Sequence, residues 1–175
     1  MTDDPIEIIV NITYPDFEMH CNDVYYLNSR AILAPTIDER DMINNYMLGL
    51  TPGEVKTHLS SDSASSSNLD IALLQKFHSP EFLNTIKCSV VPSYELKLKV
   101  GALVMLMRNI DHSSRLCNGT RLIVTKLGSH ILEAQMMSGT NAWKKILIPK
   151  LSLTPSSDLK LTFTFQRTPT VPFDA

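Results

Sequence analysis

The fold is decided by residues 94–127, which read YELKLKVGALVMLMRNIDHSSRLCNGTRLIVTKL. The first part alternates apolar and polar side chains, with Tyr94, Leu96, Leu98 and Val100 on one side and Glu95, Lys97 and Lys99 on the other. A period of two is typical of a strand with one buried face. We therefore expect a half-buried strand whose two lysines point to solvent.

Further strands follow from the same stretch outward. Residues 103–107 are continuously apolar, which indicates a buried strand, and Asn118-Gly119 predicts a turn that starts another strand at 120–126. Similar short segments recur at 131–137, 143–148 and 160–166. Short strands at this spacing predict a small barrel or a curled sheet.

The chain before this region has a different pattern. Residues 30–35 (RAILAP) are expected to form a short buried strand that ends at proline. Thr36 and Glu39 have the spacing of a capping box, in which the hydroxyl accepts from the Glu39 amide and the carboxylate returns to the Thr36 amide. A helix is predicted at 37–48, before Gly49 and Pro52-Gly53.

Two further segments lie between this helix and residue 94. Six serines in residues 60–67 predict an exposed loop or linker. Residues 69–77 are apolar enough for a short helix, and Ser79-Pro80-Glu81 predicts the start of another that ends near Lys87. Residues 1–23 give no clear prediction. Helical segments followed by strands are typical of an α+β or α/β fold.

The charge of the chain is divided unevenly. Its 175 residues carry a formal net charge of -2, but residues 1–93 hold 13 acidic and 5 basic residues, and residues 94–150 hold 9 basic and 3 acidic. The local excess of +6 favours an anionic partner, because solvated charges interact over only about 8 Å at physiological salt. The alternative is an ordinary lysine-rich solvent face of a small β-module.

Several classes of function lack their residues here. No G-K-T or G-K-S phosphate-binding loop occurs, and the five histidines show no H-x-x-x-H spacing. The cysteines Cys21, Cys88 and Cys117 are odd in number and far apart, which argues against a disulfide framework or a zinc site. We expect no catalytic residue, metal site or bound cofactor in this chain. The acidic start of the chain and its short apolar runs predict neither export nor a membrane helix.

The central stretch resembles one family. Residues 96–101 (LKLKVG), 104–111 (VMLMRNID) and 116–124 (LCNGTRLIV) are similar to the Pif (petite integration frequency) class of ATP-dependent DNA helicases, above all its plant and Helitron-transposon members. Collinear matches surround them at 30–35, 43–44, 52–54, 61–63, 80–84, 148–150 and 155–156. The resemblance covers roughly residues 14–167, and the ordered set is more specific than any single match.

The resemblance implies a domain plan. It makes residues 24–93 part of the second motor lobe (2A), with the serine-rich loop 60–67, and residues 94–150 a basic 2B subdomain, an inserted small Src-homology-type β-barrel. Residues 1–23 stay unassigned, and residues 151–175 form a return strand and a divergent tail. Intact members are expected to use ATP and magnesium and to move 5′ to 3′ on single-stranded DNA.

The motifs that bind ATP, and the later T-I-N-K-S-Q-G segment, are not found, so we expect a truncated relative in which helicase activity is not autonomous. The leading hypothesis is a non-catalytic part that binds single-stranded DNA and resides in the nucleus. The predicted DNA contacts are Lys97, Lys99, Arg108, Arg115, Asn118, Arg121, Thr36 and Asn44. Tyr94 and Trp143 could stack on bases, although packing is the more common role. The alternatives are a protein-interaction module that docks a helicase polypeptide carrying the first lobe, and an inert product.

Overall fold

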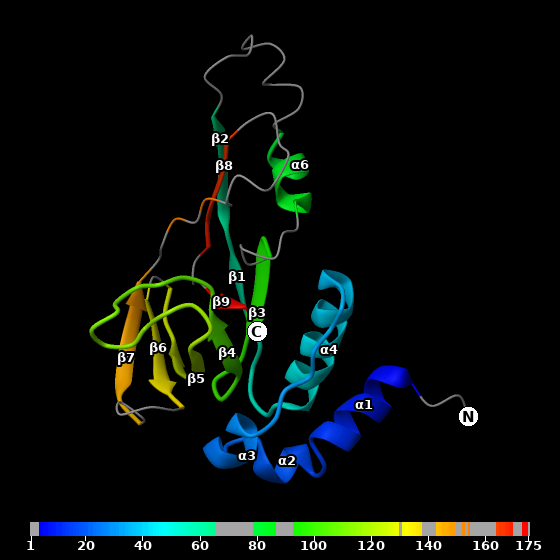
Figure 1. The fold of residues 1–175 in the computed structure, drawn as a ribbon. Coiled ribbons are helices and arrows are strands. Elements are labelled where there is room, and N and C mark those ends of the chain that lie inside the picture. The colour runs from blue at the N-terminus through cyan, green and yellow to red at the C-terminus, as the bar shows by residue number, and fades with distance from the viewer. Residues whose placement is uncertain are drawn as a thin grey trace.

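A computed structural model describes residues 4–65, 79–86, 93–129, 131–137, 143–149, 152, 154, 164–169 and 173–174. The helices are α1 (Pro5–Thr13), α2 (Phe17–His20), α3 (Val24–Asn28), α4 (Ile37–Leu50) and α6 (Pro80–Thr85). The strands are β1 (Lys56–Leu59), β2 (Ser61–Ser65), β3 (Glu95–Leu98), β4 (Leu103–Leu106), β5 (Arg121–Leu127), β6 (Ile131–Met136), β7 (Lys145–Pro149), β8 (Thr164–Thr168) and β9 (Phe173–Asp174). Figure 1 shows helices α1 to α4 beside the sheets.

The two capped helices that the sequence predicts are present. The Thr36 hydroxyl accepts from the Glu39 amide at 3.2 Å, and it donates to the Glu39 carboxylate at 2.7 Å. The Glu39 carboxylate therefore accepts from the Thr36 hydroxyl, whereas the capping box predicted that it would accept from the Thr36 amide. Helix α4 continues to Leu50, two residues beyond its predicted end. Ser79 caps α6 by accepting from the Phe82 amide at 3.2 Å, and that helix ends at Thr85. The predicted helix at 69–77 lies outside the described residues.

The strands predicted at 103–107, 120–126, 131–137 and 143–148 correspond to β4 to β7, and together with β9 they form one antiparallel sheet in the order β7-β6-β5-β4-β9. The strand predicted at 160–166 is observed as β8, which pairs with β2 outside this sheet. Among the described residues no pairing joins β7 to β9, so the sheet is open and not the closed barrel that the resemblance implies. The main core consists of alternate side chains of its strands, two leucines of β3 and Leu116 from the segment between β4 and β5: Leu96, Leu98, Val104, Leu106, Leu116, Leu122, Val124, Leu132, Ala134, Met136, Ile146 and Ile148. This is the burial pattern that a period of two predicts.

The N-terminal helices build a second core against the other face of this sheet. Its buried members are Tyr14, Phe17, Cys21, Val24, Leu27 and Met137, with Leu103 and Ile123 of the sheet packed against them. Within the stretch 1–23, which the sequence leaves unassigned, Tyr14 and helix α2 therefore pack against the sheet, whereas α1 lies against α4. No helix in the described ranges has the length and apolar character needed to cross a membrane.

Two predictions in the first half are wrong. Residues 30–35 form an irregular link between α3 and α4, in which Leu33 is 91% exposed and only Ile32 packs against the helical core. No neighbouring strand supplies hydrogen bonds there, so its apolar composition does not produce a strand. The serine-rich segment is not a loop over its first residues, because Ser61–Ser65 is strand β2 and pairs antiparallel with β8.

A buried ion pair fixes the β2–β8 ribbon. The Arg167 guanidinium donates to both carboxylate oxygens of Asp62, at 2.8 and 2.7 Å, and these side chains are 0% and 2% exposed. It also donates to the carbonyls of Leu83 and Ile86 in and after α6, at 3.0 and 3.1 Å. Arg167 thus joins β8, β2 and α6, although it lies where the family resemblance ends. Separately, β1 pairs antiparallel with β3.

Arg167→Met should lower the free energy of unfolding by about 3–5 kcal/mol, because the Asp62 carboxylate would stay buried without its counter-ion. The double variant Asp62→Asn/Arg167→Met should recover part of this loss. Urea unfolding followed by circular dichroism measures both. Lys97→Met is the matched control, since the Lys97–Glu95 pair is 50% exposed on each side and should be worth at most about 1 kcal/mol. Equal urea midpoints for wild type and the two single variants would contradict the role of Arg167.

Candidate nucleic-acid interface

Residues 107–120 form a well-anchored polar loop between β4 and β5. At its base, the Gly119 amide donates to the Leu106 carbonyl at 2.8 Å, and the Leu106 amide donates to the Thr120 carbonyl at 2.9 Å. At its tip, Asp111 and Leu116 form an isolated antiparallel bridge, and Leu116 is buried in the main core. The loop is therefore held at its base and at its tip, and Ile110 also packs against the main core.

The outward side chains include three of the predicted DNA contacts. Arg108, Arg115 and Asn118 are all exposed. Arg108 donates to the Ser152 carbonyl at 2.8 Å, and the backbone amide of Asn118 donates to the side-chain oxygen of Asn109 at 2.8 Å. Arg115 has a left-handed backbone, with φ of 58°, and its carbonyl accepts from the Thr120 hydroxyl at 3.2 Å. The loop thus presents two guanidinium groups and an amide from a fixed backbone.

The single carboxylate of this loop is turned back onto the loop. Asp111 accepts from the Ser113 amide at 2.9 Å and from the Ser113 hydroxyl at 2.6 Å. The hydrogen bonds from Ser113, and then those from Ser114, lower the pKa of Asp111 to about 2. Asp111 therefore stays ionised at neutral pH, with its oxygens committed to the serines.

Arg121 has a different environment from the one predicted. Its guanidinium donates to the carbonyls of Leu27, Asn28 and Arg30, at 2.9, 3.1 and 3.0 Å. The Arg30 carbonyl also accepts from the Tyr14 hydroxyl at 3.1 Å. Because these carbonyls take both terminal nitrogens, Arg121 joins the end of α3 to the first residue of β5. It is not positioned to bind a phosphate.

The prediction that Lys99 faces solvent is wrong. Lys99 is buried, and its ammonium donates to the Thr51 carbonyl at 2.7 Å. The alternation stops at Leu98, because the chain turns at 99–102, where Gly101 has a φ of 90° and the Ala102 amide donates to the Lys99 carbonyl. Lys99 therefore ties this turn to the end of α4 and cannot reach a phosphate.

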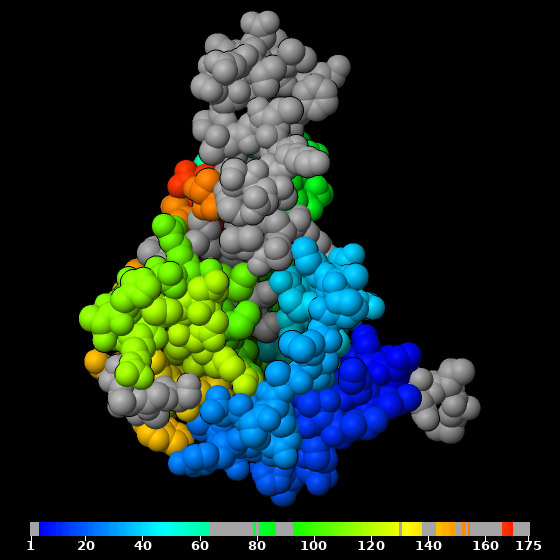
Figure 2. Space-filling view, viewed as in Figure 1, coloured from blue at the N-terminus to red at the C-terminus, as the bar shows by residue number. Residues whose placement is uncertain are grey.

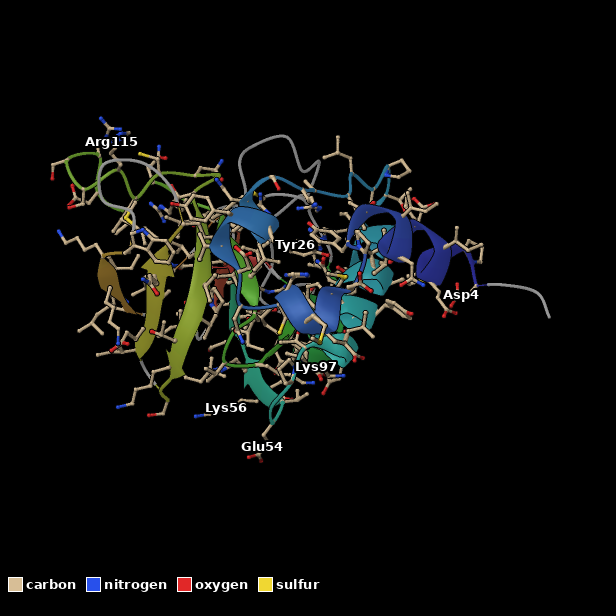
Figure 3. The ribbon with its side chains drawn as sticks, turned by 90° about the horizontal axis from the view of Figure 1, so that it is seen from below. Asp4, Tyr26, Glu54, Lys56, Lys97 and Arg115 are labelled. Atoms are coloured by element: carbon tan, nitrogen blue, oxygen red, sulfur yellow. The ribbon has the colours of Figure 1, made fainter. Side chains whose placement is uncertain are left out.

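The remaining predicted contacts lie elsewhere. Lys97 and Asn44 line a polar cleft of about 350 Å³ between α4, α6 and β3, which also contains Asp41 and Glu95. Lys97 pairs with Glu95 at 3.4 Å, and the Thr36 hydroxyl is engaged in the α4 cap. Figure 3 shows Lys97 and Arg115 on separate parts of the molecule. The basic residues of 94–150 are therefore not gathered in a single patch.

Two contacts in the structure have no counterpart in the sequence patterns. The Cys117 thiol lies 3.4 Å from Nδ1 of His112, a pairing across five residues of irregular chain. The rings of Tyr25 and Trp143 meet with centroids 6.4 Å apart, although they are far apart in sequence. Figure 2 shows the loop and the α3 region on one face of the molecule.

Comparison with known proteins identifies this region. Residues 81–127, which run from α6 through the loop to the end of β5, match the family model of the DNA helicase Pif1, 2B domain. This part of the chain is similar to a Pif1 2B domain. No curated protein matches the sequence. The domain match includes all of loop 107–120 and also Arg121.

Solved Pif1 structures show that the fold extends beyond the 2B domain. Pif1 helicase from Candida albicans is 19% identical with a TM-score of 0.52, over 91% of this chain and 39% of that one. Bacteroides sp Pif1 in complex with ADP-AlF4 is 16% identical with a TM-score of 0.52, over 99% of this chain and 34% of that one. A structure of two coordinating Pif1 helicases at forked double-stranded DNA is 21% identical with a TM-score of 0.51, and the match covers 97% of this chain and 35% of that one. The chain thus has the fold of part of a Pif1 helicase and spans little more than a third of these proteins.

Arg121→Lys should lower the free energy of unfolding by about 1–3 kcal/mol, because one ammonium cannot serve three carbonyls that a planar guanidinium reaches together. Urea unfolding measures the change. Lys126→Gln, an exposed site on the same strand, should shift stability by less than about 0.5 kcal/mol. If the two variants unfold at the same urea concentration, Arg121 does not join the helices to the sheet.

The carboxyl of Asp111 should titrate near pH 2 in carbon NMR spectra, well below the ordinary value of 3.8. A lowered folded pKa means that the ionised carboxylate stabilises the loop above about pH 4, and that this contribution is lost as the pH falls towards 2. Ser113→Ala should raise the Asp111 pKa towards 3.8 by removing the hydroxyl bond. An unchanged midpoint in this variant would contradict the assignment.

Proposed function

We propose that this chain is a single-stranded-DNA-binding part of a Pif1-type helicase, and that loop 107–120 contacts the phosphate backbone. The observation that carries the proposal is the pinned loop within the 2B domain, which presents Arg108, Arg115 and Asn118 to solvent. Guanidinium groups bind phosphate oxygens through paired donors, and an amide adds one more donor. One of the matching structures is of two Pif1 helicases that unwind forked double-stranded DNA, which supports a DNA ligand.

The proposal has limits set by the residues. The sequence has no G-K-T or G-K-S loop, so ATP and magnesium are assigned to the first lobe of a complete helicase and not to these residues. Lys97 and Asn44, which line the α4–β3 cleft, would form a second, separate contact with the DNA. Thr36, Lys99 and Arg121 are not among the proposed contacts, because their polar atoms are engaged within the chain. Arg108 is included although it donates to the Ser152 carbonyl, since its side chain stays exposed.

A helicase polypeptide that carries a first lobe is the second proposed partner. Ile12, Met19 and Leu33 in the N-terminal helical region are 76%, 84% and 91% exposed, which favours burial against another protein surface. The plant or Helitron origin, residence in the nucleus and roles in DNA repair, recombination or telomere maintenance are also part of the proposal. They are supported by the sequence resemblance alone.

Arg108→Glu/Arg115→Glu should weaken binding to a labelled oligothymidine, as measured by fluorescence anisotropy over a series of salt concentrations. Each lost phosphate contact should reduce the slope of log K against log salt by about 0.7. Lys126→Glu is the control, because Lys126 is an exposed cation at the other end of β5 from the loop. It should leave the slope close to that of wild type.

Two results would contradict the proposal. A wild-type affinity that does not change with salt would exclude phosphate contacts as the basis of binding. Equal losses in the loop variant and in Lys126→Glu would indicate a general effect of charge, without a specific role for the loop.

A further inference from the structure

Two aromatic side chains from distant parts of the sequence meet on the surface. Tyr25, in α3, is 79% exposed and Trp143, just before β7, is 53% exposed. Their ring centroids lie 6.4 Å apart with an interplanar angle of 62°, an edge-to-face arrangement. Each ring supports the other while most of their combined surface stays open to solvent.

The backbone of Trp143 is strained. Its φ is 72°, in the left-handed region that bulky residues rarely adopt. Hydrogen bonds hold it there: the Trp143 amide donates to the Met136 carbonyl at 3.0 Å, and its carbonyl accepts from the Gln135 side chain at 3.1 Å. Glycine would fit this backbone with less strain, and the exposed ring adds little to the core. Strain of this kind is common at functional sites.

The surroundings of the pair favour a polyanion. Lys144 is exposed and has no ion pair within the part of the chain that is described, and Lys145 pairs with Glu133 at 3.1 Å while remaining 65% exposed. The neighbouring Asp23 carboxylate is turned to the amides of Tyr25 and Tyr26, at 2.9 and 3.2 Å. Cations therefore follow directly after the aromatic ring in sequence.

Hydrogen bonds connect the end of loop 107–120 to α3, which carries Tyr25, and to the end of β6, which precedes Trp143. Arg121, which directly follows the loop, donates to carbonyls at the end of α3, and its own carbonyl accepts from the Met137 amide at 3.3 Å. Figure 2 shows the loop and the α3 region on one continuous face. A strand of DNA on the loop can thus continue towards the two rings.

We propose that Tyr25 and Trp143 form a stacking platform for the bases of the single-stranded DNA whose phosphates loop 107–120 and Lys144 contact. This inference rests on the proposed function and adds a base-contacting site to it. Stacking requires only the flat face of a base, so the platform should accept any sequence. Arginine and lysine contacts to phosphates alone would not distinguish DNA that has bases from DNA that lacks them.

Trp143 is the sole tryptophan of the chain, so its fluorescence reports on this site alone. Oligothymidine should quench the emission of the wild-type protein, whereas an abasic oligonucleotide of the same length should bind more weakly and quench less. Trp143→Gly and Tyr25→Ala should each bind oligothymidine about fivefold or more weakly by anisotropy, and should bind the abasic strand as wild type does. Phe82→Ala, which removes an exposed ring on α6, is the matched control and should change neither affinity.

Trp143→Gly should unfold at the same temperature as wild type or higher, because glycine relieves the left-handed strain. Equal wild-type affinity for both oligonucleotides with no quenching would overturn the platform and leave the loop proposal standing. A tryptophan that responds to a first-lobe polypeptide but not to oligothymidine would also overturn it, in favour of a protein contact. Failure to bind either oligonucleotide at low salt would instead refute the proposed function.

Discussion

The Arg121 guanidinium bonds to three carbonyls at the end of α3, and this contact sets the geometry of the whole candidate interface. The last carbonyls of a helix lack partners within the helix and carry a partial negative charge, so a guanidinium suits them well. Because Arg121 is also the first residue of β5, the helical layer cannot shift over the sheet without breaking these bonds. The helical core around Leu27 and Met137 also holds the helices against the sheet.

This arrangement would suit the extended single strand that we propose as the ligand. The loop ends at the residue before Arg121. The Arg121 carbonyl accepts from the Met137 amide, which lies shortly before Trp143 of the proposed platform. Both sites therefore keep a fixed separation, and only the ends of their side chains need to become ordered on binding. Little freedom of the backbone is lost, which favours affinity for a flexible strand.

Local patterns predicted the elements whose stability is local, and they failed where a distant partner decides. The capped starts of α4 and α6 and the buried leucines of β3 follow from spacing alone. Strand β2 has a serine-rich sequence and exists because β8 pairs with it. Lys99 and Arg121 are ordinary cations in the sequence, and only the fold reveals that backbone carbonyls bind them. Arg108, Arg115 and Asn118 lie together on the loop because they are close in sequence, and their contact with DNA stays a prediction.

The pairing of β2 with β8 has a consequence for synthesis on the ribosome. Asp62 and Arg167 are 105 residues apart, so Asp62 leaves the ribosome long before Arg167. The serine-rich β2 segment therefore has no strand to pair with during most of synthesis. Closing so long a loop is entropically costly until the intervening sheet has folded and brought the two ends together. The nascent chain should therefore pair β4 to β7 before the β2–β8 ribbon forms, and the charge of Asp62 should keep the unpaired β2 segment hydrated and less prone to aggregate.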